Sequence, residues 1–407
     1  MNSRERIQKL FKGEKIDRIP NGLGGCETAG LHILAYNTLK KLLDIKNSKT
    51  RMYTFMTNAV AEPSVLNAMN GDIIILNSKM CPSRLWGEGV ETEWKQVEFW
   101  GEKFLVPEEW EFRIEGDGTI WWENINWKCP PEGIYFDPLP SAQETDLPVS
   151  QNNSPTPDDY NPQHTIPEEQ LKKMENSAKW LYNNTKYAIC CGETITDLQL
   201  TPGGTTSWWM RLIQEPDIAH EFLHKAVEAA LDQLKLLDQA VGKYSEMLMI
   251  ADDIGDAEGI TIGPNLWRKI YKPHYKKLFT KWHKITDMKV SLHSCGAIRE
   301  ILGDLIECGV DIYNPVQISA KNMNPDKLKE NFGDDIIFYG GAYDAINMPF
   351  QTAYEKVYRV VKENIKILKD NGNYIFAGVH NLPGNIPESH LKALLKAYND
   401  TCSYNDK

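Results

Sequence analysis

The chain has 407 residues, of which 42% are hydrophobic, and its formal net charge at pH 7 is −11. This length suffices for one large core or two smaller ones, and an acidic chain without a basic stripe is unlike a nucleic-acid-binding protein. There is neither an apolar signal-peptide core at the N-terminus nor a run of about 18 apolar residues, so we expect a cytoplasmic protein that does not enter a membrane. The eight scattered cysteines favour free thiols over a disulfide framework.

Eight short runs rich in Ile, Val, Tyr or Phe end in small or polar residues, as strands buried on both faces do. Segments of helical periodicity separate most of these runs. The alternation predicts a single parallel (β/α)₈ TIM barrel over residues 1–407, with an open doubly wound α/β sheet as the alternative. The predicted strands are residues 18–25, 71–78, 187–194, 247–255, 288–296, 310–316, 335–344 and 374–381.

The connection between the second and third predicted strands is unusually long. Residues 79–186 contain eight of the twelve tryptophans, and residues 141–170 are polar and rich in Pro, Ser and Asn. We expect residues 79–186 to be an insertion over the barrel mouth, in which residues 79–138 form β-hairpins and the polar piece is an exposed loop. The tryptophans could serve an aromatic substrate or simply fill the core of this subdomain.

Functional side chains of a parallel barrel lie at the carboxyl ends of its strands. The aspartates at these ends could be acid–base groups, or they could cap the helices that follow. The strand ends supply three candidate catalytic residues and four candidate substrate-binding residues: Asp253, Tyr343 and Asp344 for catalysis, and Glu27, Asn314, Gln317 and Asn381 for substrate.

His293 and Cys295 are two residues apart in the fifth predicted strand, so both side chains point to the same face. An imidazole and a thiolate on one face can hold Zn²⁺, and a catalytic zinc site keeps one position open. A third ligand would come from another strand end, where His380 is the best-placed candidate. A packed cysteine beside a hydrogen-bonded histidine would explain the same pair without a metal. The other candidates for the third ligand are Asp253, Glu193, Cys190 and Cys191.

Four stretches together resemble the uroporphyrinogen decarboxylase superfamily. They are HSCGAIREILGDLIECGVDIYNPVQISAKNMNPDKLKENFGDDIIFYGGAYD, GNYIFAGVHNLPGNIP, ADDIGDAEGITIGPNLWRKIYKPHYKKLF and the N-terminal RERIQKLFKGEKIDRIP. The resemblance covers most of the chain and is weakest over residues 79–186. It implies a (β/α)₈ barrel and one of two activities, which are decarboxylation of uroporphyrinogen and zinc-dependent methyl transfer to or from a corrinoid protein.

Two departures from the family pattern separate these activities. The decarboxylase branch holds a multiply carboxylated tetrapyrrole with arginines near the first strand, whereas NGLGGCETAGLHILAY (residues 21–36) contains none. The resemblance to the methyltransferase branch lies in the H-x-C pair, His293 and Cys295. Thiol-methylating members of that branch complete the zinc site with a later cysteine. This chain has no cysteine between Cys308 and Cys402 and offers His380 instead.

The favoured prediction is therefore a zinc-dependent methyltransferase that acts between a small methylated substrate and a corrinoid (cobalamin). O-demethylation of a methoxylated aromatic compound is the favoured reaction. Since the chain lacks a D-x-H-x-x-G corrinoid signature, we expect the corrinoid on a partner protein. A homodimer is compatible with the sequence. The alternatives are a decarboxylase or other lyase, a thiol-methylating methylcobamide methyltransferase, and a non-catalytic corrinoid- or tetrapyrrole-binding protein.

Overall fold

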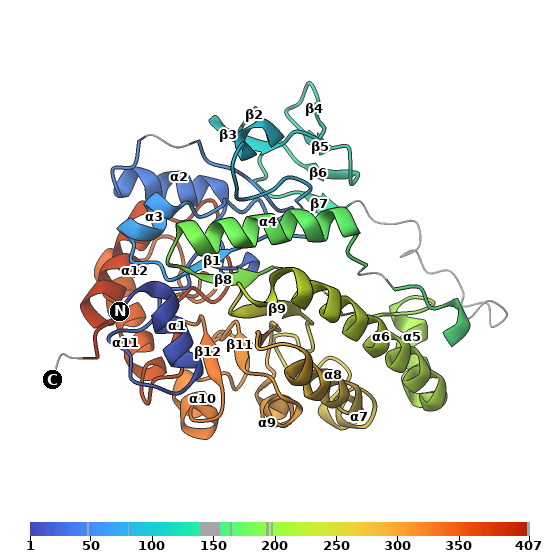
Figure 1. Cartoon of the computed structure of the whole chain (residues 1–407). Helices are drawn as coiled ribbons and strands as arrows, with labels where there is room; N and C mark the ends of the chain where they lie inside the picture. Colours follow the sequence, from blue (N-terminus) through green and yellow to red (C-terminus); the bar gives the residue numbers. More distant parts are fainter. Residues whose placement is uncertain are drawn as a thin grey trace.

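Seven parallel strands form the central sheet of this α/β protein. The computed structural model describes residues 1–46, 49–79, 81–138, 155–162, 165–192, 195–196 and 198–404. Within this sheet each strand pairs in parallel with the sheet strand that follows it in the sequence, and the sheet curls as in a TIM-like fold (Figure 1). The strands are β1 (Ile73–Ile75), β8 (Ala188–Cys191), β9 (Met247–Ala251), β10 (Lys289–His293), β11 (Ile312–Asn314), β12 (Ile337–Tyr339) and β13 (Tyr374–Ile375).

The prediction of eight strands needs a correction at residues 18–25, which do not form a strand. Asn21 instead makes isolated parallel bridges to Gly71 and to Phe376, which lie next to the two edge strands β1 and β13. The backbone N–H of Gly22 donates to the carbonyl of Phe376 at 2.8 Å. The extended run stops there because Gly24 adopts a φ of +77°, a left-handed conformation that glycine accepts readily. One bridging residue thus links the two edges of the sheet.

A buried ion-pair network holds this N-terminal segment in place. The side chain of Asp72, which is fully buried, accepts hydrogen bonds from Arg6 and Arg18 at 2.6 Å each. The same carboxylate also accepts the backbone N–H of Asn21 at 2.8 Å. Because Asp72 immediately precedes β1, the network joins α1 (Ser3–Phe11), the bridging segment and the first strand.

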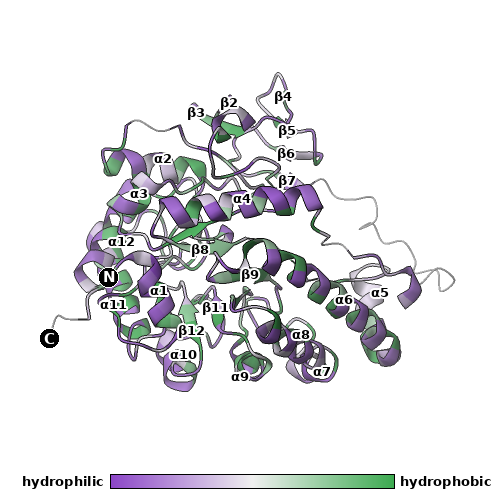
Figure 2. Ribbon diagram, in the orientation of Figure 1, coloured by the Kyte–Doolittle hydropathy of each residue, from purple (hydrophilic) through white to green (hydrophobic). Residues whose placement is uncertain are grey.

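Twelve α-helices occur among the described residues, and most of them surround the sheet (Figure 1). In Figure 2 the strand β8 is coloured as hydrophobic, while hydrophilic colour is common along the outer sides of the helices. No helix of the described chain is both long and apolar enough to pass through a membrane. The helices after α1 are α2 (Ile33–Leu42), α3 (Pro63–Ala68), α4 (Glu168–Asn184), α5 (Thr205–Gln214), α6 (Pro216–Leu237), α7 (Pro264–Ile270), α8 (Lys272–Ile285), α9 (Arg299–Cys308), α10 (Pro325–Phe332), α11 (Tyr354–Leu368) and α12 (Glu388–Thr401).

Helix α9 shows how the sequence sets these helices. Ile301, Leu302 and Leu305 recur at helical spacing and are buried on one face. Gly309 ends the helix with a φ of 107°, a conformation that a residue with a Cβ disfavours. The apolar spacing and the glycine therefore determine the extent of this helix.

Two antiparallel sheets lie between β1 and β8 in the chain and form their own core (Figure 1). Trp110 and Trp122 are buried in this core with their ring centroids 4.2 Å apart, so at least these tryptophans fill a local core. Of the predicted polar loop, residues 141–154 and 163–164 lie outside the described residues, and its last residues, from Glu168, begin α4 instead of continuing the loop. That residues 79–186 cover the barrel mouth stays a prediction. The strands are β2 (Trp94–Phe99) with β3 (Glu102–Pro107), and β4 (Phe112–Ile114), β5 (Ile120–Trp122), β6 (Trp127–Cys129) and β7 (Asp137–Pro138).

Candidate metal centre

Three side chains that could bind a metal meet at the carboxyl end of the sheet. His293 is the last residue of β10, Cys295 follows two residues later, and His380 follows β13. One potential ligand atom from each lies within 4.8 Å of the other two. Cys295 Sγ is 3.6 Å from His293 Nε2, and the two imidazole centroids are 5.3 Å apart. The sheet therefore brings together residues that are 87 positions apart in the sequence, as positions 293 and 380 show.

Asn314 at the end of β11 orients the imidazole of His293. Its Oδ1 lies 2.8 Å from His293 Nδ1 and also accepts the hydroxyl of Thr28 at 2.7 Å. Its Nδ2 donates to the carbonyl of Tyr339 at 3.2 Å, which fixes the orientation of the amide. Since Oδ1 can only accept, Nδ1 of His293 carries the proton and Nε2 keeps its lone pair. That lone pair is on the nitrogen nearest to Cys295, as a metal ligand requires.

The loops after β9, β10 and β11 are tied together beside the three side chains. Asp253 Oδ1 accepts the backbone N–H of Cys295 at 2.9 Å and lies 3.7 Å from His293 Nε2. Gln317 Oε1 accepts the backbone N–H of Gly296 at 2.7 Å. A Cβ at Gly296 would approach backbone atoms of Gly255 to 2.5 Å, so only glycine fits at this crossing. Asp253 and Gln317 thus fix the backbone that carries Cys295.

Burial sets the protonation of the three side chains. It lowers the pKa of His293, an effect that the nearby Asp253 partly opposes. Burial and the neighbouring His293 lower the pKa of His380 to about 4. Burial, with Asp253 in support, raises the pKa of the Cys295 thiol to about 12. Both imidazoles are consequently neutral near pH 7 and can donate electron pairs, whereas the thiol keeps its proton until a cation displaces it.

Two predicted substrate-binding residues, Glu27 and Asn381, lie on segments that pack together. Glu27 begins the short 3₁₀ turn η1 (Glu27–Ala29). Burial raises the pKa of its carboxyl to about 7, and its Oε1 has no hydrogen-bond partner among the described residues. Asn381 Oδ1 accepts the backbone N–H of Gly30 at 2.7 Å. The other two, Asn314 and Gln317, hydrogen-bond to His293 and to the backbone of Gly296. That any of these four predicted residues contacts a substrate stays a prediction.

Of the two other predicted catalytic residues, Tyr343 is turned toward a helix. Its hydroxyl hydrogen-bonds with Nδ1 of His390 in α12 at 3.0 Å. Asp344 is buried, and its Oδ1 accepts the backbone N–H of Ile346 at 2.9 Å. Its Oδ2 has no hydrogen-bond partner among the described residues. Among the described residues no hydrogen bond, ion pair or ring contact joins Tyr343 or Asp344 to the three metal-binding candidates, and their catalytic roles stay predictions.

The alternative third ligands are arranged differently from His380. Cys190 is buried in an apolar cluster with Met247 and Ile312, and burial raises its pKa well above the usual range. Cys191 donates a hydrogen bond from Sγ to Asn77 Oδ1 at 3.4 Å. Glu193 lies outside the described residues.

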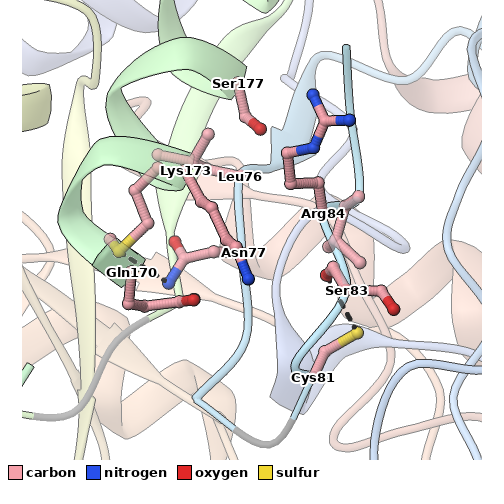
Figure 3. A pocket seen from close by; sticks show the side chains of 10 residues that line it. Leu76, Asn77, Cys81, Ser83, Arg84, Gln170, Lys173 and Ser177 are labelled. Atoms are coloured by element: carbon pink, nitrogen blue, oxygen red, sulfur yellow. Dashed lines mark hydrogen bonds between the residues drawn. The ribbon is translucent and has the colours of Figure 1, made fainter. Parts of the chain in front are cut away.

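An aromatic pocket beside the three side chains was not predicted from the sequence. It has a volume of about 300 Å³, and Asp253 is one of the residues that line it. The adjacent tryptophans at positions 208 and 209 were its only clear sequence signal. Its aromatic lining consists of Trp208, Trp209, Trp267, Tyr271 and Tyr275. A second cavity, between the end of β1 and α4, has a volume of only about 10 Å³ and could hold no more than a water molecule (Figure 3).

Comparison with known proteins identifies a family domain and a similar fold. Residues 199–401 match the family model described as uroporphyrinogen decarboxylase (URO-D). A methyltransferase from Methanosarcina mazei has a similar solved structure, with a TM-score of 0.55 and 15% sequence identity over 98% of this chain and 99% of that chain. At this identity the likeness concerns the fold. No curated protein matches the sequence. Residues 199–401 thus form a domain of the uroporphyrinogen decarboxylase (URO-D) family, and this domain contains all three candidate ligands.

Proposed function

We propose that this protein is a zinc-dependent methyltransferase that moves a methyl group between a methoxylated aromatic compound and a corrinoid held by a partner protein. The observation that carries the proposal is the meeting of His293, Cys295 and His380. Two ligands bound to tetrahedral zinc at about 2.1 Å (nitrogen) and about 2.3 Å (sulfur) are about 3.6 Å apart. The separation between His293 Nε2 and Cys295 Sγ is 3.6 Å.

The chemistry of the three side chains also fits a catalytic zinc ion. Nitrogen and sulfur are the ligands that zinc prefers, and three protein ligands leave one coordination position for a substrate. A hydrogen bond between the thiol and the imidazole would account for the same 3.6 Å contact. It would not account for the second imidazole, that of His380, whose nearest charged or titratable neighbours are His293 and Asp253.

Methyl transfer is supported by the URO-D domain together with the methyltransferase of similar fold. Decarboxylation of a tetrapyrrole has less support, because residues 21–36 contain no arginine. The preceding Arg18 is engaged with the buried Asp72. Guanidinium groups for the carboxylates of such a substrate are therefore missing from this segment.

Zinc at this site would act as a Lewis acid on the ether oxygen and make that oxygen a better leaving group. His293, Cys295 and His380 would hold the ion, while Asn314 keeps Nε2 of His293 directed at it. A reduced corrinoid would supply the electron pair that accepts the methyl group, and the electron pair of the broken methyl–oxygen bond would stay on the oxygen. The oxygen would take up a proton from solvent, and the exposed carboxylate of Asp253, 3.7 Å from His293 Nε2, would relay it.

The proposal is tested with purified protein, a methoxyphenol and a free reduced cobalamin. We expect the methoxyphenol to lose its methyl group and methylcobalamin to accumulate. Treatment with a chelator should abolish the reaction, and added zinc should restore it. An unchanged rate after complete removal of zinc would contradict the metal role. Release of CO₂ from a tetrapyrrole acetate by the same protein would favour the decarboxylase instead.

The identity of the third ligand is tested with three variants. His380→Ala should lower zinc affinity, whereas His380→Cys should largely keep it, because zinc accepts sulfur as well as nitrogen. Asp253→Ala, which alters the nearest carboxylate, should keep the ion. The measurement is competition for zinc against a chromogenic chelator. Loss of zinc in the Asp253 variant with retention in His380→Ala would show that the carboxylate is the ligand.

The supporting role of Asn314 gives a further expectation. Asn314→Ala should lower zinc affinity roughly 10- to 100-fold, the range typical for a residue that orients a metal-bound histidine. Asn364→Ala is the matched control, since Asn364 is also buried and donates to the carbonyl of Ala342 in another part of the fold. Equal zinc affinity in both variants and the wild type would exclude the positioning role of Asn314.

A further inference from the structure

The aromatic pocket and the candidate metal centre share a residue. Asp253 lines the pocket, and its Oδ1 accepts the backbone N–H of Cys295 and lies 3.7 Å from His293 Nε2. The pocket is formed by the chain after β8, by the loop after β9 and by helices α5, α7 and α8. Both therefore lie at the carboxyl end of the sheet, where TIM-like folds place their substrates.

Two buried rings of the pocket, Trp208 and Tyr275, have polar atoms that are already hydrogen-bonded. Trp208 Nε1 donates to the hydroxyl of Tyr271 at 2.9 Å, and the hydroxyl of Tyr275 donates to Asp252 Oδ2 at 2.8 Å. These rings thus offer mainly their apolar surfaces to a ligand. A cavity of about 300 Å³ is at the lower end of the range for small-molecule sites, which suits a compound with one ring.

No lysine, arginine or histidine is among the described residues that line the pocket. Its one charged lining residue is Asp253, which already holds the Cys295 amide and faces the two candidate ligands. A carboxylate on the ligand would consequently lose its hydration without gaining a counter-charge from any residue that lines the pocket. The remaining polar lining is neutral and consists of Gln199, Thr201, Thr205 and Thr261.

We infer that this pocket binds the ring of a neutral aryl methyl ether, and that it discriminates against aryl ethers that carry a carboxylate. The inference rests on the proposed function and names its substrate class. Trp209 is the specificity residue best suited to a test. Its side chain is 43% exposed, whereas Trp208 and Trp267 are 0% and 2% exposed and belong to the main core. Removing Trp209 should therefore alter the pocket without disturbing the fold.

The experiment is calorimetric titration of the zinc-loaded protein with 2-methoxyphenol, 2-methoxybenzoate and tetramethylammonium, without any corrinoid. We expect 2-methoxyphenol to bind more tightly than the other two probes. Trp209→Ala should weaken its binding at least about fivefold, the loss expected when one aromatic contact is removed. Trp121→Ala is the matched control, because Trp121 is also partly exposed but lies in β5, and it should bind like the wild type.

Thr261→Lys provides a second variant that places a cation in the lining. It should bring the affinity for 2-methoxybenzoate up toward that for 2-methoxyphenol. Tighter binding of 2-methoxybenzoate or tetramethylammonium by the wild-type protein would overturn the inference, as would unchanged binding in Trp209→Ala. The pocket and the proposed reaction can be refuted independently of each other. Methyl transfer with an unchanged KM in Trp209→Ala would refute the pocket alone, whereas ring binding without methyl transfer would refute the reaction alone.

Discussion

Cys295→Ala should leave the protein folded and reduce its bound zinc from about one ion per chain to less than about a tenth. The thiolate would be the only charged ligand of the three, since both imidazoles are neutral at pH 7. The loss of affinity should exceed the roughly 10- to 100-fold effect of losing a residue that only orients a ligand. Elemental analysis after dialysis, combined with circular dichroism for the fold, makes the measurement.

Cys402→Ala is the matched control, because Cys402 is also half-buried but lies at the end of α12. Its zinc content should equal that of the wild type. Zinc binding near pH 8 should also release about one proton per ion, because the buried thiol has a pKa of about 12 and must be deprotonated to bind. Cys295→Ala should release none. Full zinc occupancy in the Cys295 variant would remove the basis for the proposed centre.

Asp72→Ala should lower the free energy of unfolding by about 3–5 kcal/mol, the cost typical of removing one partner from a buried ion pair. The variant leaves the guanidinium of Arg6, whose side chain is only 5% exposed, without the Asp72 carboxylate. It also leaves the backbone N–H of Asn21 without its acceptor at the place where the edges of the sheet meet. Urea denaturation followed by tryptophan fluorescence gives the value.

An exposed ion pair provides the comparison for Asp72. Asp232 pairs with Lys235 on α6, and both side chains are more than half exposed. Asp232→Ala should change the free energy of unfolding by about 1 kcal/mol or less. Equal, small losses in both variants would mean that the bridge at Asn21 holds without the buried carboxylate.

Most of the sheet could be predicted because its strands are buried on both faces and are therefore continuous apolar runs. Residues 18–25 contain three glycines and an asparagine. Hydrogen bonds of the Asn21 side chain take the place of the regular backbone hydrogen bonds of a strand. The side chain of Asn21 donates to the carbonyl of Met69 and accepts the N–H of Leu23. Such competition between side chain and backbone depends on neighbours that are distant in sequence, and hydrophobic periodicity does not reveal it.

The pairing of His293 with Cys295 was predicted from the alternation of side chains along a strand, although β10 ends at His293 and Cys295 lies in the loop that follows. His380 could be predicted as a third ligand because the carboxyl ends of parallel strands lie at the same edge of a sheet. Tyr343 shows the limit of that reasoning. It follows β12, yet its side chain turns toward α12, because local loop geometry decides which residue beyond a strand faces inward. The aromatic pocket escaped prediction because its residues come from two loops and three helices that share no periodic pattern.

The hydrogen bond from Thr28 to Asn314 has a consequence for biosynthesis. It connects positions 286 residues apart, and it supports the imidazole of His293. Thr28 lies outside residues 199–401, the part that matches the family model. During translation the ribosome makes Thr28 early, Asn314 much later and His380 later still. The nascent chain can therefore assemble the three candidate ligands only after His380 has been made, so loading of an ion at this site would follow the synthesis of every strand of the central sheet.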